Sequence, residues 1–175
     1  MSRQANPALS FDELTVGDEW ESPGRTVTEA DVVNFAGVSG DFNPIHTDHR
    51  TASRGPFRRP IAHGLLGLSI ASGLAIAAPP VDTLAFLAII DWKFLQPIFF
   101  GDTIHVITRV AALEPKSRGR RGLVTWHRRI VNQNGVTVQE GTTQTLVRNR
   151  TGAARGDSNG EDNTQEPVGS PAGPA

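Results

Sequence analysis

The chain contains no cysteine and no tyrosine among its 175 residues, and only one methionine. The absence of cysteine excludes disulfides, thiolate zinc sites and cysteine nucleophiles, and nothing marks an oxidising compartment, so we expect a cytoplasmic protein. A strong net charge is also missing, because 17 basic and 18 acidic residues leave a net charge of −1. This balance disfavours binding to a nucleic acid backbone or to anionic lipid, so we expect neither nucleic acid nor membrane as a partner.

Hydrophobic runs are short. The longest, residues 64–78, includes glycines and serines and ends at Pro79-Pro80. As a helix it would span about 23 Å, which is less than the roughly 30 Å thickness of a hydrocarbon core. The first residues also lack the apolar segment of a signal peptide. We therefore expect residues 64–78 to form a buried helix and not a membrane span.

The composition divides the chain at about residue 150. Residues 151–175 are mostly glycine, serine, asparagine, proline, alanine and acidic residues, with one valine and no aromatic residue. Such a segment cannot bury enough apolar surface to offset the entropy lost on ordering. We expect a single folded domain over residues 1–150, followed by a disordered low-complexity tail over residues 151–175.

An earlier helix is predicted to begin at Thr28, whose hydroxyl can cap the helix while Asp31 completes a capping box. We expect Gly37 and Gly40 to end this helix. The segment 41–44 then reads as a loop, because the residue before Pro44 is disfavoured in helical angles. Catalytic side chains are often found in loops of this kind.

Four segments with strand character follow the apolar helix. Apolar and polar residues alternate in the second and third segments, which is typical of half-buried antiparallel strands. Asn134-Gly135 is a strong hairpin signal, since both residues tolerate positive φ. We predict an α+β fold in which the sheet curls around the helix of residues 64–78, with edge-to-edge dimerisation. The four segments are Leu84–Leu95, Thr103–Leu113, Gly122–Asn132 and Val136–Arg148.

The first candidate site lies in the loop after the first helix, where His46 follows Asp41 by five residues. A carboxylate and an imidazole within reach of one water form a natural acid/base pair, and Asn43 could orient the water or hold the loop. Two alternatives remain open. Asp41, His46, Asp48 and His49 are possible metal ligands, although no spacing matches a familiar zinc or iron site and we expect no metal. The loop could also be an Asx turn with a histidine that has no catalytic role.

The second candidate site is the start of the apolar helix, in Arg59-Pro60-Ile61-Ala62-His63-Gly64-Leu65. Free backbone amides at a helix start can stabilise negative charge on a carbonyl oxygen, and Gly64 would let a substrate approach closely. The alternative is an ordinary helix entry with a glycine used for packing. Ser72 is either a core hydroxyl or a polar group beside a pocket. The basic turn 116–121 could contact phosphate groups of a carrier, and a solvated turn explains it equally well.

Residues 35–48 and 60–66 together resemble the signature of the MaoC-like dehydratases, the (R)-specific enoyl-CoA hydratases. Residues 97–102 resemble the strand connection of the same family, so the similarity extends over roughly residues 11–148. The resemblance implies a hot-dog fold, in which an antiparallel sheet wraps around a long central helix and two copies form an acyl tunnel. It also implies reversible hydration of a trans-2-enoyl thioester to the (R)-3-hydroxyacyl thioester, carried on coenzyme A or acyl carrier protein, without a cofactor.

The same resemblance assigns roles to individual residues. Asp41 and His46 would hold and activate the water, and His46 would also handle the proton at the neighbouring carbon. Gly64 would donate its amide to the oxyanion, Asn43 would position the water, and Ser72 would support the site from the helix. His63 is expected to be structural.

One departure from the family pattern is Phe35, where many relatives have tyrosine.

Alternative functions are a hot-dog acyl-CoA thioesterase and a non-catalytic acyl-thioester-binding subunit of a two-part dehydratase. We expect a homodimer, with a heterodimer with a related subunit as the alternative.

Overall fold

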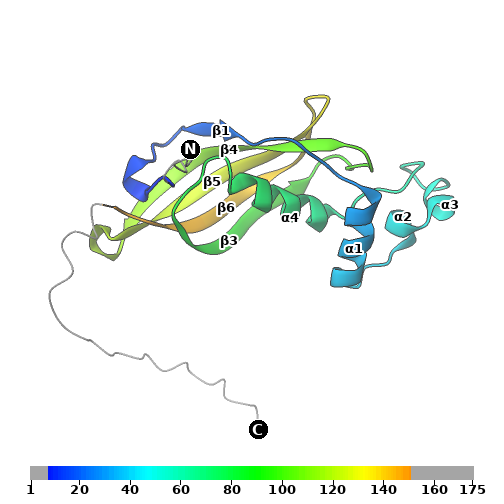
Figure 1. The fold of residues 1–175 in the computed structure, drawn as a ribbon, viewed down its shortest axis with the longest axis horizontal. Helices are drawn as coiled ribbons and strands as arrows, with labels where there is room; N and C mark the ends of the chain where they lie inside the picture. Colours follow the sequence, from blue (N-terminus) through cyan, green and yellow to red (C-terminus); the bar gives the residue numbers. More distant parts are fainter. Residues whose placement is uncertain (1–7, 151–175) are drawn as a thin grey trace, which may run out of the picture.

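The computed structural model describes residues 8–150, which form one curved antiparallel sheet with helices at one end and across one face (Figure 1). The strand order is β1-β4-β5-β6-β3, and β2 pairs with β4 beside β1. The strands are β1 (Glu19–Glu21), β2 (Arg25–Thr26), β3 (Thr83–Phe94), β4 (Thr103–Lys116), β5 (Arg121–Asn132) and β6 (Thr137–Arg148). The α-helices are α1 (Glu29–Ser39), α2 (Pro44–Thr47), α3 (His49–Ala52) and α4 (Gly64–Ala75), and two 3-10 turns are η1 (Phe11–Glu13) and η2 (Ser117–Gly119).

The four predicted strands and the α+β class are confirmed, and each strand boundary differs from its prediction by at most a few residues. The hairpin between β5 and β6 turns at Gly135, whose φ is 74°. The predicted capping box is present at α1, where the Asp31 amide donates to the Thr28 hydroxyl and the Asp31 carboxylate accepts from the Thr28 amide. Gly37 does not end this helix, because one glycine inside a helix costs only about 1 kcal/mol. The helix ends at Gly40, which adopts the left-handed conformation.

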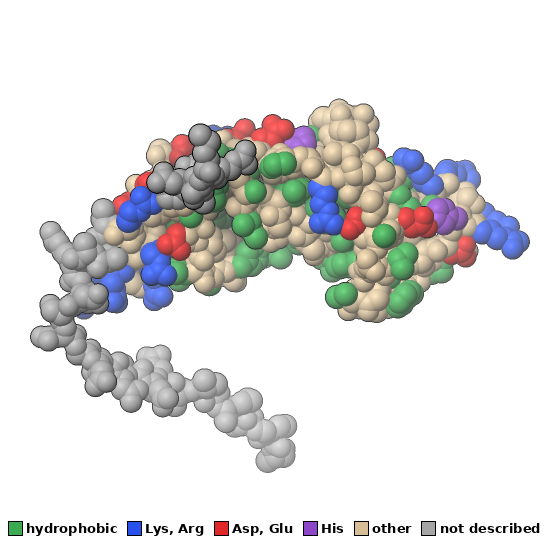
Figure 2. Space-filling model, in the orientation of Figure 1, with side chains coloured by type: hydrophobic (Ala, Val, Ile, Leu, Met, Phe, Trp, Pro, Cys, Tyr) green, Lys and Arg blue, Asp and Glu red, His purple; other side chains and the backbone are tan. Residues whose placement is uncertain are grey.

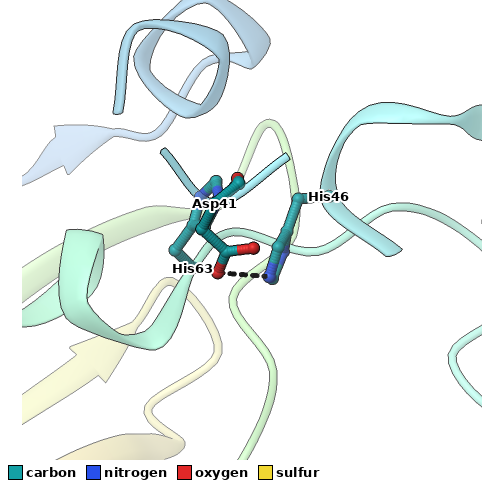
Figure 3. A group of neighbouring side chains, drawn as sticks. All are labelled: Asp41, His46 and His63. Carbon is teal, nitrogen blue, oxygen red and sulfur yellow. Dashed lines mark hydrogen bonds and ion pairs between the residues drawn. The ribbon is translucent and has the colours of Figure 1, made fainter. Parts of the chain in front are cut away.

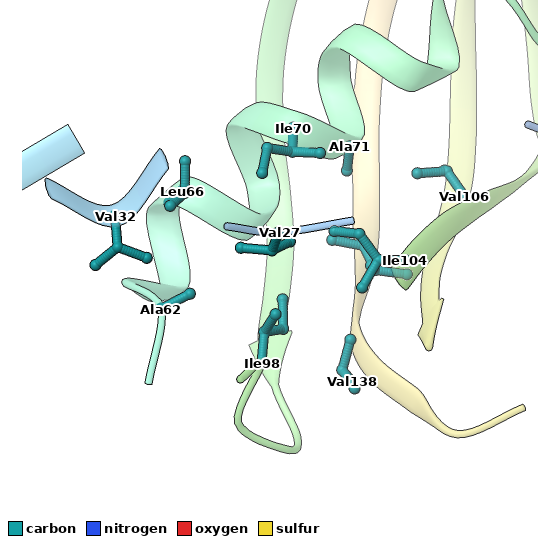
Figure 4. Packing of buried hydrophobic residues seen from close by; sticks show 11 residues of the cluster. Val27, Val32, Ala62, Leu66, Ile70, Ala71, Ile98, Ile104, Val106 and Val138 are labelled. Atoms are coloured by element: carbon teal, nitrogen blue, oxygen red, sulfur yellow. The ribbon is translucent and has the colours of Figure 1, made fainter. Parts of the chain in front are cut away.

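Helix α4 packs one face onto the sheet (Figure 4). Leu66, Ile70 and Ala71 lie in a cluster with apolar residues of β4, β5 and β6. The opposite side of the helix is open, with Leu65 59% exposed and Ile76, just past its end, 73% exposed. The expected burial on most sides is therefore wrong for the single chain, because the sheet covers only one face. Among residues 8–150 we find no helix with the length and hydropathy needed to cross a membrane.

The sheet has two distinct ends. Helices α1, α2 and α3 gather at the end where α4 begins, and the turn between β4 and β5 lies at the opposite end (Figure 1). Since β4 has 14 residues, about 45 Å of strand separates the basic turn 116–121 from the helical end. The basic turn therefore lies far from the loop of His46 in the same chain. The predicted tail, residues 151–175, lies outside the described residues.

Candidate active site

The loop predicted after α1 continues into two single-turn helices that fix His46. The Asn43 side-chain oxygen accepts a hydrogen bond from the Ile45 amide at 3.1 Å, and Pro44 occupies the first turn of α2. Proline suits this position because its missing N–H has no partner there in any helix. His46 is therefore carried by a capped helical turn instead of an irregular loop. Asn43 uses its side-chain oxygen for the cap, not for a contact with His46.

The orientation of the His46 ring is set by backbone. Its Nδ1 lies 2.8 Å from the Ile61 carbonyl oxygen, which only accepts, so Nδ1 carries the hydrogen. In the neutral ring the Nε2 atom then has the free lone pair. The Ile61 amide in turn donates to the Ile45 carbonyl oxygen at 3.2 Å, which joins α2 to the segment before α4. His46 is largely buried, with 12% of its side chain exposed.

Asp41 faces His46 across a short gap (Figure 3). One carboxylate oxygen accepts from the Asn43 amide at 3.1 Å, while the other lies 3.9 Å from His46 Nε2. This separation is too long for a direct hydrogen bond. A water at normal hydrogen-bond distance from both atoms would see them at an angle of about 90°, which a water can accept. The Asp41 side chain is 53% exposed, so solvent can enter the gap.

His63 contacts both Asp41 and His46. It is buried, its Nε2 donates to the Asp41 carbonyl oxygen at 2.9 Å, and its ring stacks on His46 with centroids 3.9 Å apart. These contacts fix the backbone of Asp41 and one face of the His46 ring, in agreement with the structural role expected for His63. The other nitrogen, Nδ1, is buried without a hydrogen-bond partner among residues 8–150.

A metal at this position has three possible ligands. Asp41, His46 and His63 each offer an atom, and these atoms lie within 4.8 Å of one another. However, a nitrogen lone pair lies in the plane of its ring, and the two rings are stacked at an angle of only 28°. Their lone pairs therefore do not converge on one point, as ligands of a zinc or iron ion must. Asp48 and His49 have other contacts: Asp48 caps α3, and His49 pairs with Glu29 at 2.8 Å.

Gly64 is the first residue of α4, and its amide has no hydrogen-bond partner in the part of the chain that the structure describes. A side chain at this position would approach the Phe94 ring to 2.8 Å, so glycine is needed for this packing. Gln139 of β6, which the sequence analysis missed, fixes the same turn. Its amide nitrogen donates to the Gly64 carbonyl oxygen at 3.1 Å, and its oxygen accepts from the Trp92 indole at 3.0 Å.

His46 and Gly64 line one cavity of about 630 Å³. Its other walls are mostly apolar and include Leu65, Phe94 and Ile98, with Gln96 and Gln139 as polar exceptions. Asn43 lines a separate cavity of about 210 Å³, and Ser72 is exposed two turns along α4 beside other cavities. The structure thus brings Asp41, His46 and Gly64 together, and it places Ser72 elsewhere.

Comparison with known proteins shows the family of the chain. A family model described as a MaoC-like domain matches residues 13–131. The (R)-specific enoyl-CoA hydratase of Aeromonas caviae is 36% identical over 133 residues, which are 76% of this chain and 95% of that protein. Protein MaoC of Klebsiella aerogenes is 38% identical over 96 residues, which are 55% of this chain and 29% of that longer protein.

Solved structures show the fold. The MaoC-like dehydratase from Rhodospirillum rubrum superposes with a TM-score of 0.72 at 30% identity, covering 82% of this chain and 99% of that chain. A Mycobacterium tuberculosis protein with a double hot-dog fold has a TM-score of 0.72 at 20% identity, covering 88% of this chain and 47% of that chain. The predicted hot-dog fold is confirmed. With its family match, relatives and fold in agreement, the chain belongs to the MaoC-like dehydratase family.

Proposed function

We propose that the protein catalyses the reversible hydration of trans-2-enoyl-CoA to (R)-3-hydroxyacyl-CoA. The observation that carries the proposal is that Asp41 and His46 Nε2 lie 3.9 Å apart, with His46 and Gly64 both lining one largely apolar cavity. A hydratase needs this combination of a water-binding pair, an apolar acyl site and a donor for the thioester carbonyl. The (R) configuration rests on the similarity to the Aeromonas caviae hydratase.

In the proposed reaction, a water donates one hydrogen bond to the Asp41 carboxylate and one to His46 Nε2, and these two bonds hold it in position. As the water oxygen bonds to C3, His46 Nε2 takes one of its protons, and the double-bond electrons move toward the thioester oxygen. His46 then returns this proton to C2 as the carbonyl reforms. Both the hydroxyl and the proton reach the same face of the substrate, so the addition is syn and no other reactant is needed.

The Gly64 amide stabilises the intermediate charge. It lies at the positive end of α4, where a first-turn N–H has no partner within the helix. A donor aimed at the thioester oxygen lowers the barrier for attack at C3, because this oxygen carries the negative charge in the enolate. Gln139, bonded to the carbonyl oxygen of Gly64 in the next peptide unit, holds the first turn of α4 against β6.

Coenzyme A would enter past the tip that carries α3. Lys and Arg side chains gather at this end of the molecule (Figure 2). Arg50 lies in α3, and Arg54 and Arg58 follow it on exposed positions. Guanidinium groups suit the phosphates of coenzyme A, and this tip is close to His46, unlike the basic turn at the far end of the sheet.

The direct test is the loss of enoyl-thioester ultraviolet absorbance when purified protein is added to crotonyl-CoA, with free thiol measured in the same sample. We expect absorbance to fall without thiol release, and chiral analysis to give the (R)-hydroxy product. Thiol release would overturn the proposal in favour of a thioesterase. No change in either assay, with acyl carrier protein substrates tried as well, would favour a non-catalytic subunit.

We also propose that two copies pair through β3. This strand is at the edge of the sheet, and large apolar side chains on both of its faces are exposed, including Leu87, Ile89 and Ile90. Hydrophobic side chains are visible along the lower edge of the molecule, where β3 runs (Figure 2). An exposed apolar edge strand favours pairing with another strand, and a second copy offers the same edge.

Sedimentation velocity tests this pairing. We expect a dimer for the wild type and dissociation for Ile90→Lys, because a charge on an edge strand opposes pairing. Val38→Lys is the matched control, since Val38 is an exposed apolar residue on α1, away from β3. A wild-type monomer with full turnover would contradict the proposal, and a monomer that gains turnover only with a related subunit would favour the heterodimer.

A further inference from the structure

A buried cation on the sheet has no anion beside it. Arg128 of β5 is only 9% exposed, and we find no hydrogen bond or ion pair to its guanidinium among residues 8–150. Burial lowers the pKa of Arg128 to about 10, so the group stays charged at neutral pH. The Arg128 guanidinium carbon lies 5.9 Å from the centroid of the Trp126 ring, which is a weak cation–π contact and not an ion pair. A buried charge without an anion is unfavourable, and buried arginines are normally paired.

Neighbouring strands add two more buried polar atoms without partners. The hydroxyl oxygens of Thr108 on β4 and Thr143 on β6 are buried and unbonded within the described residues. Thr108 is directly opposite Arg128 in the sheet, and Thr143 is opposite Trp126, two positions before Arg128. Three of the four such atoms in residues 8–150 thus gather on one patch of the inner face of the sheet. Native proteins leave few polar atoms unsatisfied, so a cluster of them indicates a missing ligand.

Arg128 opens into two cavities that both lie beside Ser72. One, of about 370 Å³, includes Thr108, Trp126 and Ile76, and the other, of about 360 Å³, includes Ser69 and Thr143. No aspartate or glutamate of the described chain lines either cavity. The cation is therefore accessible to a small anion, and no carboxylate among residues 8–150 competes for it.

A stripe of α4 connects these cavities with the catalytic one. Leu65, Ser69 and Ser72 of α4 and Ile76, just past its end, follow one another at intervals of three and four residues, so they lie along one side of the helix. Leu65 lines the cavity of His46, whereas Ser72 lines both cavities of Arg128. The distance along the helix from Leu65 to Ser72 is about 10 Å. An extended chain could lie on this stripe with its ends at the two sites.

We propose that Arg128 binds the carboxylate of a molecule with an apolar chain, together with the hydroxyls of Ser72 and Thr108 in one cavity or of Ser72 and Thr143 in the other. Two sources offer this chemistry. One is the far end of an acyl thioester whose reacting carbons lie at Asp41 and His46, in which case the proposal rests on the proposed function. The other is a free carboxylic acid that binds in the cavities alone.

The composition of the cavities favours a carboxylate over a phosphate. A phosphate group carries nearly two negative charges and three strong acceptor oxygens, but the cavities offer one cation. A carboxylate has one charge and two oxygens, which match the planar fork of a single arginine. The remaining walls, with Ala75, Pro79, Val81 and Phe86, suit an apolar chain.

Two measurements on the full-length protein test the site. In the first, the melting temperature is recorded with octanoate and with the uncharged octanol. We expect octanoate to raise the melting temperature of the wild type more than octanol does, and this difference to vanish in Arg128→Met. In the second, kcat/KM is compared for a pair of trans-2-enoyl-CoA substrates of equal length, one ending in a methyl group and one in a carboxylate. We expect their ratio to shift roughly 10- to 100-fold against the carboxylate in Arg128→Met, the range for lost hydrogen bonds to a charged group.

Controls separate the possible outcomes. Arg129→Met removes a neighbouring arginine on the opposite face of β5 and should change neither measurement. Arg128→Lys keeps the charge and should retain part of the octanoate effect. It is the substitute test if Arg128→Met does not fold. Without ligand, Arg128→Met should melt higher than the wild type, because an unpaired buried charge is removed.

The two sources give different results. Loss of the octanoate effect together with the kinetic shift supports the substrate end, and loss of the octanoate effect alone supports a free acid. Loss of the octanoate effect in a protein that does not hydrate crotonyl-CoA would support the site while refuting the proposed function. An octanoate effect equal in wild type and Arg128→Met would overturn the proposal. So would a lower melting temperature of Arg128→Met joined to dissociation of the dimer, since Arg128 would then be paired with the second copy.

Discussion

The two ends of α4 differ in how fully the chain satisfies its own polar groups. At the beginning of the helix, one nitrogen of His46, one nitrogen of His63 and the amide of Gln139 each bond to a backbone carbonyl, and His63 Nδ1 is the one buried polar side-chain atom there without a partner in residues 8–150. Near the end of the helix, Arg128 and Thr108 have buried polar atoms without partners in residues 8–150. Both ends border cavities, so accessibility does not explain the difference.

The difference corresponds to two kinds of task. A group that must direct a proton at one carbon has to keep a single orientation before the substrate arrives, and hydrogen bonds to backbone provide this. A group that only has to meet an anion can remain unsatisfied until the ligand brings the missing partner. Substitutions at each end should therefore have different consequences, and the following predictions are ordered by the size of the expected effect.

The largest effect is expected from the pair that handles the water. Asp41→Asn and His46→Ala should each lower kcat for crotonyl-CoA by roughly 10²- to 10⁴-fold, because acid–base catalysis contributes this much. Circular dichroism and the melting temperature should stay close to those of the wild type. His49→Ala is the control, since His49 is exposed and its ring bonds to Glu29 outside the cavity. Near-normal turnover in either variant would show that the changed residue does not handle the water, and the beginning of α4 would then not be a catalytic end.

A smaller effect is expected when the support of the pair is altered. His63→Phe keeps an aromatic ring against His46 but removes the hydrogen bond to the Asp41 carbonyl oxygen. The Asp41 carboxylate should then be less well placed, and kcat should fall by about 10- to 100-fold with little change in KM. Steady-state kinetics with crotonyl-CoA measure this split. A rise in KM at constant kcat would show that His63 acts on substrate binding instead of on the orientation of Asp41.

The sequence predicted the residues whose signals are local. The capping box of Thr28 and Asp31 and the hairpin at Gly135 each depend on neighbours within a few residues, and both were found as expected. Asp41 and His46 are also close in the chain, so the loop alone was enough to predict their proximity. In contrast, the helical turn at α2 was missed, because the prediction considered only the residue before Pro44 and not that proline itself is favourable in a first turn.

Long-range partners were beyond this reasoning. Gln139 and Arg128 both point to the inner face of the sheet, where alternation predicts apolar residues. Gln139 is buried because Trp92 and the Gly64 carbonyl satisfy it, and both lie far away in the sequence. The exposed side of α4 was likewise predicted as buried, since hydropathy does not distinguish cover by the same chain from cover by another molecule. A polar residue on an inward position was the signal that could have identified both sites.

The third prediction concerns the stability of the catalytic end. Gln139→Leu should lower the free energy of unfolding by about 1–3 kcal/mol, because the Trp92 indole and the Gly64 carbonyl oxygen lose their buried partner. Gln144→Leu is the matched control, since Gln144 lies on the other, half-buried face of β6 and its side-chain amide donates to the Thr125 hydroxyl. Urea unfolding of both variants makes the comparison. Equal losses would show that the bonds of Gln139 are no more important than those on the open face.

The smallest effect is expected at the beginning of α1, the helix that leads to Asp41. Asp31→Ala removes half of the capping box and the ion pair with Arg25 at 2.7 Å. The free energy of unfolding should fall by about 1 kcal/mol at neutral pH, a typical value for a lost helix cap. Turnover should be unchanged, because Asp41 is positioned by His63 and Asn43 and not by the first turn of α1. A parallel loss of kcat would show that the order of the catalytic end is transmitted through α1.

The pH dependence of this variant gives a second check. The backbone amide and then the hydroxyl of Thr28 donate to the Asp31 carboxylate and hold its pKa below the usual value of 3.8. A carboxyl group with a lowered pKa in the folded state stabilises the protein fully above its unfolded value, and this contribution is lost as the pH falls through the folded value. The stability difference between wild type and Asp31→Ala should therefore be constant from neutral pH down to about 5 and shrink below about 4. Urea unfolding at several pH values measures it, and a difference that persists in strong acid would mean that the cap depends on the shape of the side chain and not on its charge.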